Sequence, residues 1–126
     1  MGVVNTYAFG PILVSEGQLG KWMLEEDYYH YREPRCAIGQ LGPLEYLLVV
    51  VDGRGAADSE GCQVATLAQF MYDQGCIQAY NLDGGNSALM YFGGENFSQK
   101  TFKAERSVTD IIYFATGIDA GLTAEE

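Results

Sequence analysis

The sequence predicts a single α+β domain in which a mixed or mainly antiparallel sheet packs with one principal amphipathic helix. Several short segments are rich in branched and aromatic residues and are bounded by glycine, as strands are. One segment alone has apolar residues at helical spacing. The chain of 126 residues is long enough for one hydrophobic core and short for two ordinary domains, so residues 1–126 are treated as one unit.

The composition excludes some classes of protein. A hydrophobic content of 48%, with nine Tyr and six Phe, argues against a disordered chain. The net charge of -10 would repel a polyanion, so nucleic acid is excluded as a partner. Cys36, Cys62 and Cys76 lack paired short spacing, which indicates buried thiols rather than a zinc site or a disulfide framework. There is no membrane-length apolar run and no signal peptide pattern.

The N-terminal third contains one expected strand and a long connection. Residues 7–14 read as a turn that leads into a short strand, and Glu16-Gly17 reads as the next turn. Residues 25–33 are crowded with tyrosine and charge and lack periodicity, so we expect an exposed connection. His30 lies within it, and a lone histidine among tyrosines is expected to be structural or solvent-facing.

The middle of the chain predicts two strands and the helix. Residues 35–40 suit a strand, and residues 44–51 suit a central strand because they are apolar on both faces. A helix of roughly thirteen residues should follow, capped by Ser59 or Asp58 and stopped by Gly75. Its apolar face comprises Val64, Leu67, Ala68, Met71 and Tyr72.

Three further strands are expected after the helix. Residues 77–82 form the first, and residues 87–92 form the second, which a Gly93-Gly94 turn folds back as a hairpin. Residues 108–115 should form the last strand, and residues 117–126 a frayed tail.

The chemistry-bearing residues stand where two of these strands end. One strand runs into Asp52-Gly53-Arg54 and the other into Asp83-Gly84-Gly85. Glycine there allows close approach of the backbone to a ligand, and its N–H can point at an anion. If the two strands are parallel and close, both carboxylates meet at one edge of the sheet. The alternative is a pair of ordinary Asp-Gly turns.

Such a set of residues suits cleavage between a sugar and a phosphate. A carboxylate can activate water or attack the anomeric carbon directly. Because phosphate leaves readily, cations that bind it matter more than an acid catalyst. Arg35, Arg54 and Arg106 could serve, since guanidinium groups bind phosphate oxygens in bidentate fashion.

Four motifs in order along the chain resemble the phosphodiester glycosidase family. They are Pro34-Arg35-Cys36-Ala37-Ile38-Gly39, Val51-Asp52-Gly53-Arg54, Asn81-Leu82-Asp83-Gly84-Gly85-Asn86-Ser87 and Glu105-Arg106. The resemblance implies hydrolysis of a sugar-1-phosphodiester, a glycan or cell-envelope substrate such as one containing N-acetylglucosamine, and an extracellular or envelope location. It implies no cofactor.

The resemblance also implies roles for individual residues. Asp83 would be nucleophile or base, with Asp52 as its partner. Asn81 would contact sugar hydroxyls, while Ser87 and the Gly84 and Gly85 amides would receive phosphate. The full set of matching polar positions is Arg35, Asp52, Arg54, Asn81, Asp83, Ser87 and Arg106.

The chain departs from the family pattern in its glycine loop. The family usually has a third glycine and two serines where this chain has Asn86, Ser87 and Ala88, and a threonine is common at Cys36. The family's usual N-terminal portion also has no counterpart that we can find. Two other readings therefore stay open: a non-catalytic carbohydrate-binding or envelope module, and a Ca²⁺ or Mg²⁺ site at Asp52 and Asp83.

Overall fold

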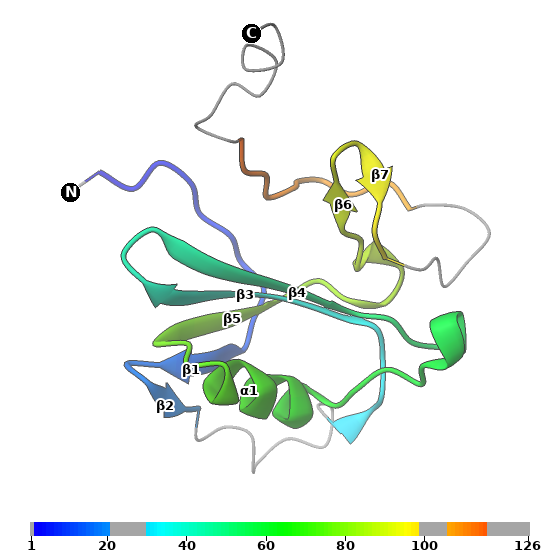
Figure 1. Ribbon diagram of the computed structural model, residues 1–126, viewed down its shortest axis with the longest axis horizontal. Coiled ribbons are helices and arrows are strands. Elements are labelled where there is room, and N and C mark those ends of the chain that lie inside the picture. Colours follow the sequence, from blue (N-terminus) through cyan, green and yellow to red (C-terminus); the bar gives the residue numbers. More distant parts are fainter. Residues whose placement is uncertain (1, 21–29, 99–105, 116–126) are drawn as a thin grey trace, which may run out of the picture.

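The computed structural model describes residues 2–20, 30–98 and 106–115, and it confirms the predicted α+β fold (Figure 1). Five strands form one sheet of order β2-β1-β5-β3-β4, and each neighbouring pair is antiparallel. One face of the sheet packs on the helix α1 (Val64–Asp73). The strands are β1 (Ile12–Ser15), β2 (Gln18–Leu19), β3 (Arg35–Gly42), β4 (Glu45–Val51) and β5 (Gln78–Leu82).

Two tight turns set the sheet's hairpins. Glu16 and Gly17 both have positive φ, 51° and 72°, so they form the two-residue connection that matches the twist of β1 and β2. The predicted turn at this place is confirmed. Pro43 and Leu44 connect β3 to β4, and Leu44 has a φ of 59°. For that reason β4 begins at Glu45, one residue later than the sequence predicts.

The helix buries the face that its spacing predicts. Val64, Leu67, Ala68 and Met71 are each at most 1% exposed, whereas Tyr72 lies on the accessible side. The predicted stop at Gly75 is confirmed, because the amide of Cys76 donates to the Met71 carbonyl in a left-handed helix cap.

The N-terminal cap of α1 differs from the expectation. The N-cap residue is Gln63, so the helix has ten residues. Ser59 does not cap it because its hydroxyl donates to the Asp52 carbonyl instead. The Gln63 side chain donates to the carbonyl of His30, which supports a structural place for that residue. Residues 25–29 of the predicted connection lie outside the described residues, as does the predicted tail at 117–126.

Small residues let the helix lie close to the sheet. Ala37 and Ala79 are buried in the core that Leu13, Val14 and the helix share. At Gly39 an added Cβ would lie 2.5 Å from the Cys76 sulfur and 2.7 Å from the Met71 Cε. The centre of β3 therefore has no room for a side chain on the helix side.

Two strand predictions were wrong. β4 is an edge strand of the sheet rather than a central one. Its apolar pattern arises because one face, with Leu47, Val49 and Val51, packs against the core while the other carries half-exposed residues such as Leu48. Residues 108–115 form no strand. This segment contacts the rest of the protein through single interactions instead of a ladder of backbone hydrogen bonds: the Tyr7 hydroxyl donates to the Ile111 carbonyl, and the Phe114 ring packs on the Tyr46 ring.

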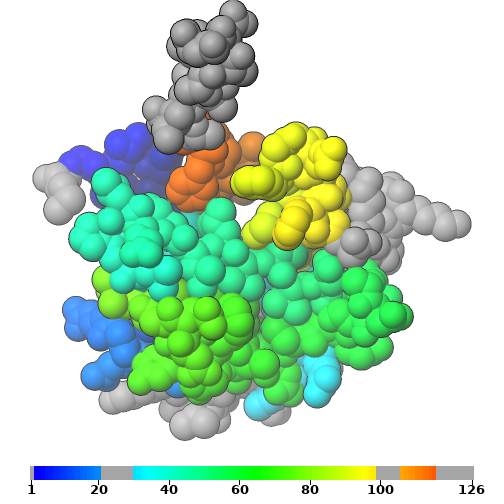
Figure 2. Space-filling model, in the orientation of Figure 1, coloured from blue at the N-terminus to red at the C-terminus, as the bar shows by residue number. Residues whose placement is uncertain are grey.

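A short hairpin and the 106–115 segment lie on the side of the sheet away from α1 (Figures 1 and 2). The hairpin consists of β6 (Tyr91–Phe92) and β7 (Glu95–Asn96), joined by the predicted Gly93-Gly94 turn. The expected strand at 87–92 is thus shortened, because Ser87 belongs to the 3-10 turn η4 (Gly85–Ser87).

Gly39→Ala should lower the free energy of unfolding by about 1–3 kcal/mol, because the new methyl group overpacks the contact with α1. Urea denaturation measures this change. Gly42→Ala is the matched control on the same strand, since its nearest neighbour lies at an ordinary 3.5 Å. Equal stability of the two variants would show that the contact at Gly39 relaxes freely.

Candidate active site

Both aspartates follow strands that end at the same edge of the sheet. β4 and β5 pair with opposite sides of β3 and are both antiparallel to it, so they run parallel to each other. Cys36 of β3 is opposite both Val50 and Leu82. Asp52 and Asp83 therefore stand on either side of the beginning of β3, two strand spacings or about 10 Å apart along the edge.

The two loops pack directly on the backbone of Pro34. A Cβ added to Gly53 would lie 2.8 Å from the Pro34 nitrogen, and one added to Gly84 would lie 2.5 Å from its oxygen. The amide of Gly85 donates to that same oxygen at 2.8 Å. Glycine is required here for contact between loops. The Gly85 amide, which the sequence analysis assigned to phosphate, is engaged by Pro34 in this structure.

Two guanidinium groups flank the 83–87 loop. Arg106 lies with a terminal nitrogen 3.3 Å from the Ser87 hydroxyl oxygen and 3.9 Å from the Asp83 carboxylate. The Arg54 guanidinium lies against Gly85, 3.3 Å from where a Cβ would be. Because Arg106 and Asp83 are 60% and 49% exposed, their ion pair is screened and leaves both groups accessible to a ligand.

Glu33 orients Arg54 and was missed by the sequence analysis. Its carboxylate accepts from the Arg54 Nε at 2.5 Å, while the terminal nitrogens of the guanidinium face Gly85. The only sequence signal is the position of Glu33 immediately before the Pro34-Arg35 motif. Its pairing with a residue 21 positions away depends on the packed loops.

The loop that carries Arg54 is held in an uncommon conformation. Arg54, Ala57 and Asp58 have φ values of 54°, 52° and 58°, in the left-handed region that non-glycine residues rarely adopt. The turn η3 (Ala56–Asp58) lies within this loop. The Ser59 hydroxyl closes the loop by donating to the Asp52 carbonyl and accepting from the Gly61 amide. Such conformations concentrate at functional sites.

Two predicted ligand-binding residues make hydrogen bonds within the protein. Arg35 donates to the carbonyls of Cys62 and Tyr31, at 3.1 and 2.8 Å, and so ties β3 to the segment before α1. Asn81 is 3% exposed and its amide donates to the Gly10 carbonyl at 2.8 Å. These contacts fix the orientation of both side chains, and the buried Asn81 Oδ1 accepts no hydrogen bond from the described residues.

The pKa of the Cys36 thiol depends on Asp83 because both residues lie at this edge. Burial, and secondarily the negative charge of Asp83, raise the pKa of the Cys36 thiol to about 11. Burial also raises the pKa of Cys62 and of Cys76. All three cysteines are free; the prediction of a buried residue is confirmed at Cys76, which is 2% exposed, whereas Cys36 and Cys62 are only half-buried.

The described residues contain no group of three or more His, Cys, Asp or Glu side chains that could hold a metal ion. Within the same ranges, no helix is long and apolar enough to cross a membrane. What the edge offers chemically is the Asp83 carboxylate, two guanidinium groups and a hydroxyl at one glycine loop, with Asp52 on the other side of β3.

Comparison with known proteins identifies relatives of this arrangement. The sequence profile of the phosphodiester glycosidase family matches residues 1–115. The SPbeta prophage-derived uncharacterized protein YomE of Bacillus subtilis is 30% identical over 116 residues, which cover 88% of this chain and 17% of that protein.

Two solved structures share the fold. The catalytic domain of zebrafish N-acetylglucosamine-1-phosphodiester alpha-N-acetylglucosaminidase, auto-inhibited by its pro-peptide, superposes with a TM-score of 0.60 and 22% identity over 77% of this chain and 38% of its own. A hypothetical protein from Synechocystis superposes with a TM-score of 0.59 and 24% identity over 73% of this chain and 18% of its own. The chain thus spans a minor part of each of these three relatives.

Asp83→Asn should speed alkylation of Cys36 by iodoacetamide at pH 9. Removing the negative charge lowers the thiol pKa, so the thiolate fraction rises by about twofold or more. Mass spectrometry of the alkylated peptide gives the rate for Cys36 alone. Asp52→Asn is the matched control and should leave that rate unchanged. A rate unaffected by Asp83→Asn would contradict the proximity of the two groups.

Proposed function

Since this chain belongs to the phosphodiester glycosidase family, we propose that it hydrolyses the bond between the anomeric carbon of a sugar and a phosphodiester oxygen. One observation carries the proposal: the loop that contains Asp83 and Ser87 is contacted by the guanidinium groups of Arg54 and Arg106. This loop lies at the edge of the sheet where Asp52 also lies.

The proposed reaction divides the work between carboxylates and cations. Asp83 acts on the sugar side, as nucleophile or as the base that activates water, and Asp52 is its partner. Arg106, with the Ser87 hydroxyl beside it, holds the phosphoryl oxygens as charge develops on the leaving group. Arg54 adds a second positive charge at Gly85 of the same loop, and Glu33 fixes its orientation.

The sugar and the location rest on the family alone. N-acetylglucosamine is the sugar named for the zebrafish relative, and we propose an acetamido sugar as the first substrate to test. A glycan or envelope substrate would place the protein outside the cytoplasm. The altered glycine loop, with Asn86 and Ala88, would then shape phosphate binding differently from the family pattern.

A carbohydrate-binding module without turnover is the second candidate function. Tyr91, Phe92 and Phe97 of the hairpin that follows the glycine loop are 53%, 80% and 74% exposed. Aromatic faces of this kind pack on sugar rings. Measurable glycan binding with no product after prolonged incubation would favour this function over hydrolysis.

Asp83→Asn should lower kcat by about 100-fold or more, because the variant loses the carboxylate that attacks or activates water. Release of the phosphate monoester from a small panel of sugar-1-phosphodiesters, followed by ³¹P NMR, measures the rate. Asp73→Asn on α1 is the matched control, since its carboxylate accepts only from the Gln69 side chain among the contacts that the structure describes. Full activity of Asp83→Asn would refute the assignment.

Arg106→Gln should raise KM for the phosphodiester by about tenfold or more, because a charge-assisted contact to phosphate is lost. Affinity for the free sugar should change little. Arg32→Gln, which removes an exposed arginine elsewhere on the chain, should leave KM unchanged. If Arg106→Gln and Arg32→Gln have the same KM for the phosphodiester, Arg106 has no specific role in binding the phosphate.

A further inference from the structure

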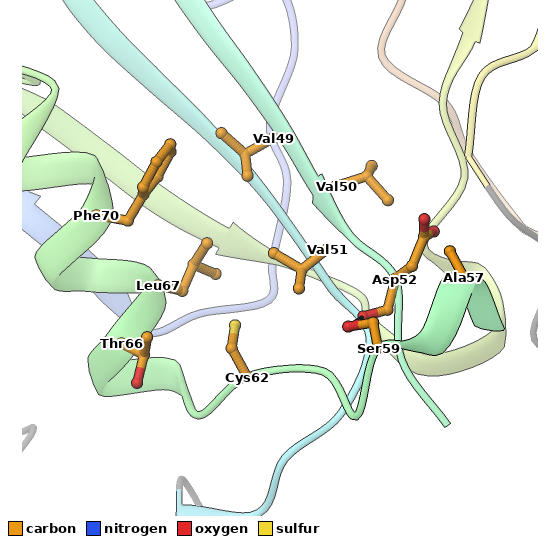
Figure 3. A pocket seen from close by; sticks show the side chains of 10 residues that line it. All are labelled: Val49, Val50, Val51, Asp52, Ala57, Ser59, Cys62, Thr66, Leu67 and Phe70. Atoms are coloured by element: carbon orange, nitrogen blue, oxygen red, sulfur yellow. Dashed lines mark hydrogen bonds between the residues drawn. The ribbon is translucent and has the colours of Figure 1, made fainter. Parts of the chain in front are cut away.

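A largely apolar groove of about 460 Å³ runs between the edge strand β4 and the helix α1 (Figure 3). Val49 and Val51 line it from the strand, and Leu67 and Phe70 line it from the helix. The Phe70 ring is 45% exposed although it belongs to the wall of the groove. The volume is within the range of small-molecule sites.

The groove becomes polar at one end. Asp52 and Ser59 lie there, away from Phe70, and the Ser59 hydroxyl donates to the Asp52 carbonyl (Figure 3). Two residues beyond Asp52, the guanidinium of Arg54 reaches Gly85 of the glycine loop. Asp52 thus belongs both to the polar end of the groove and to the candidate active site, and the apolar part of the groove extends from it toward Phe70.

We propose that this groove binds a hydrophobic alcohol portion of the substrate, so that the protein acts on sugar-1-phosphodiesters of alkyl or isoprenoid-like alcohols. This inference rests on the proposed function. The phosphoryl group would lie near Arg54 and Arg106, and the hydrocarbon chain would extend past Asp52 toward Phe70. No polar side chain other than Thr66 lines the apolar part among the described residues, which suits a hydrocarbon better than a second sugar.

The reaction on such a substrate is a balanced hydrolysis. Water adds to the anomeric carbon, and the bond from that carbon to the phosphodiester oxygen breaks. The electron pair of that bond goes to the phosphate oxygen, and the carboxylate receives a proton from water. The products are the free sugar and an alkyl phosphate monoester, whose hydrocarbon chain stays in the groove until release.

An extended peptide is the competing occupant of the groove. The last three residues of β4, Val49 to Val51, and the following Asp52 line it, so the edge of the strand that faces away from β3 forms part of the wall. A peptide could pair with that edge. The alkyl chain is favoured because the polar end of the groove holds Asp52, a residue of the proposed catalytic pair, and a peptide strand does not require a carboxylate there.

A chain-length series tests the proposal. Wild-type kcat/KM should rise from methyl to octyl phosphodiesters of one sugar, by up to about fourfold per methylene that enters the groove. Phe70→Gln should lower kcat/KM for the octyl substrate by about tenfold and leave the methyl substrate unchanged. Tyr72→Gln is the matched control, because Tyr72 is 44% exposed on the same helix but does not line the groove. If Phe70→Gln and Tyr72→Gln have the same kcat/KM for the octyl substrate, the proposal is overturned.

Binding of octyl phosphate, measured by calorimetry below its micelle concentration, separates this inference from the proposed function. Binding that Phe70→Gln weakens and Tyr72→Gln does not supports the groove site even if no phosphodiester is hydrolysed, in which case the proposed function fails alone. Hydrolysis of methyl and octyl substrates at equal rates with no octyl phosphate binding overturns the groove site alone. A hexapeptide of alternating apolar residues that binds and resists displacement by octyl phosphate also overturns it.

Discussion

The backbone of Pro34 is the contact on which the candidate site depends. Gly53 and Gly84 approach it so closely that neither position can hold a Cβ without movement, and the Gly85 amide donates to its carbonyl. Loops from two strands that are not neighbours are thereby fixed on a common support. Glycine is needed in these loops because backbone meets backbone, and the polar side chains that face a ligand gain their relative positions from that contact.

Positive side chains gather at this edge although the whole chain is strongly acidic. The protein has a net charge of -10, yet Arg54 and Arg106 both approach one loop of five residues. Concentrating guanidinium groups beside Asp83 creates a place where an anion can bind next to the carboxylate proposed to attack carbon or activate water. Glu33 and the closed 52–61 loop hold Arg54 there, so the geometry exists before a ligand arrives.

The sequence predicted the elements that depend on interactions between residues close together in the chain. Helical spacing and the Gly75 stop identified α1, and glycines identified the turns at 16–17 and 93–94, because these depend on neighbouring residues. The convergence of the loops after β4 and β5 followed from motif position, although β3 between them was not foreseen. Partners chosen by packing escaped prediction: Arg35 donates to carbonyls, the Gly85 amide meets Pro34, and residues 108–115 contact side chains rather than a strand edge.

The most direct test of the central claim is an amide NMR titration with a non-hydrolysable glycosyl phosphonate ester. If one ligand bridges the two loops that rest on Pro34, resonances of Asp52-Gly53-Arg54 and of residues 83–87 should shift together, with one common dissociation constant. Shifts confined to one loop, or to the surface of α1 opposite the groove, would contradict the account.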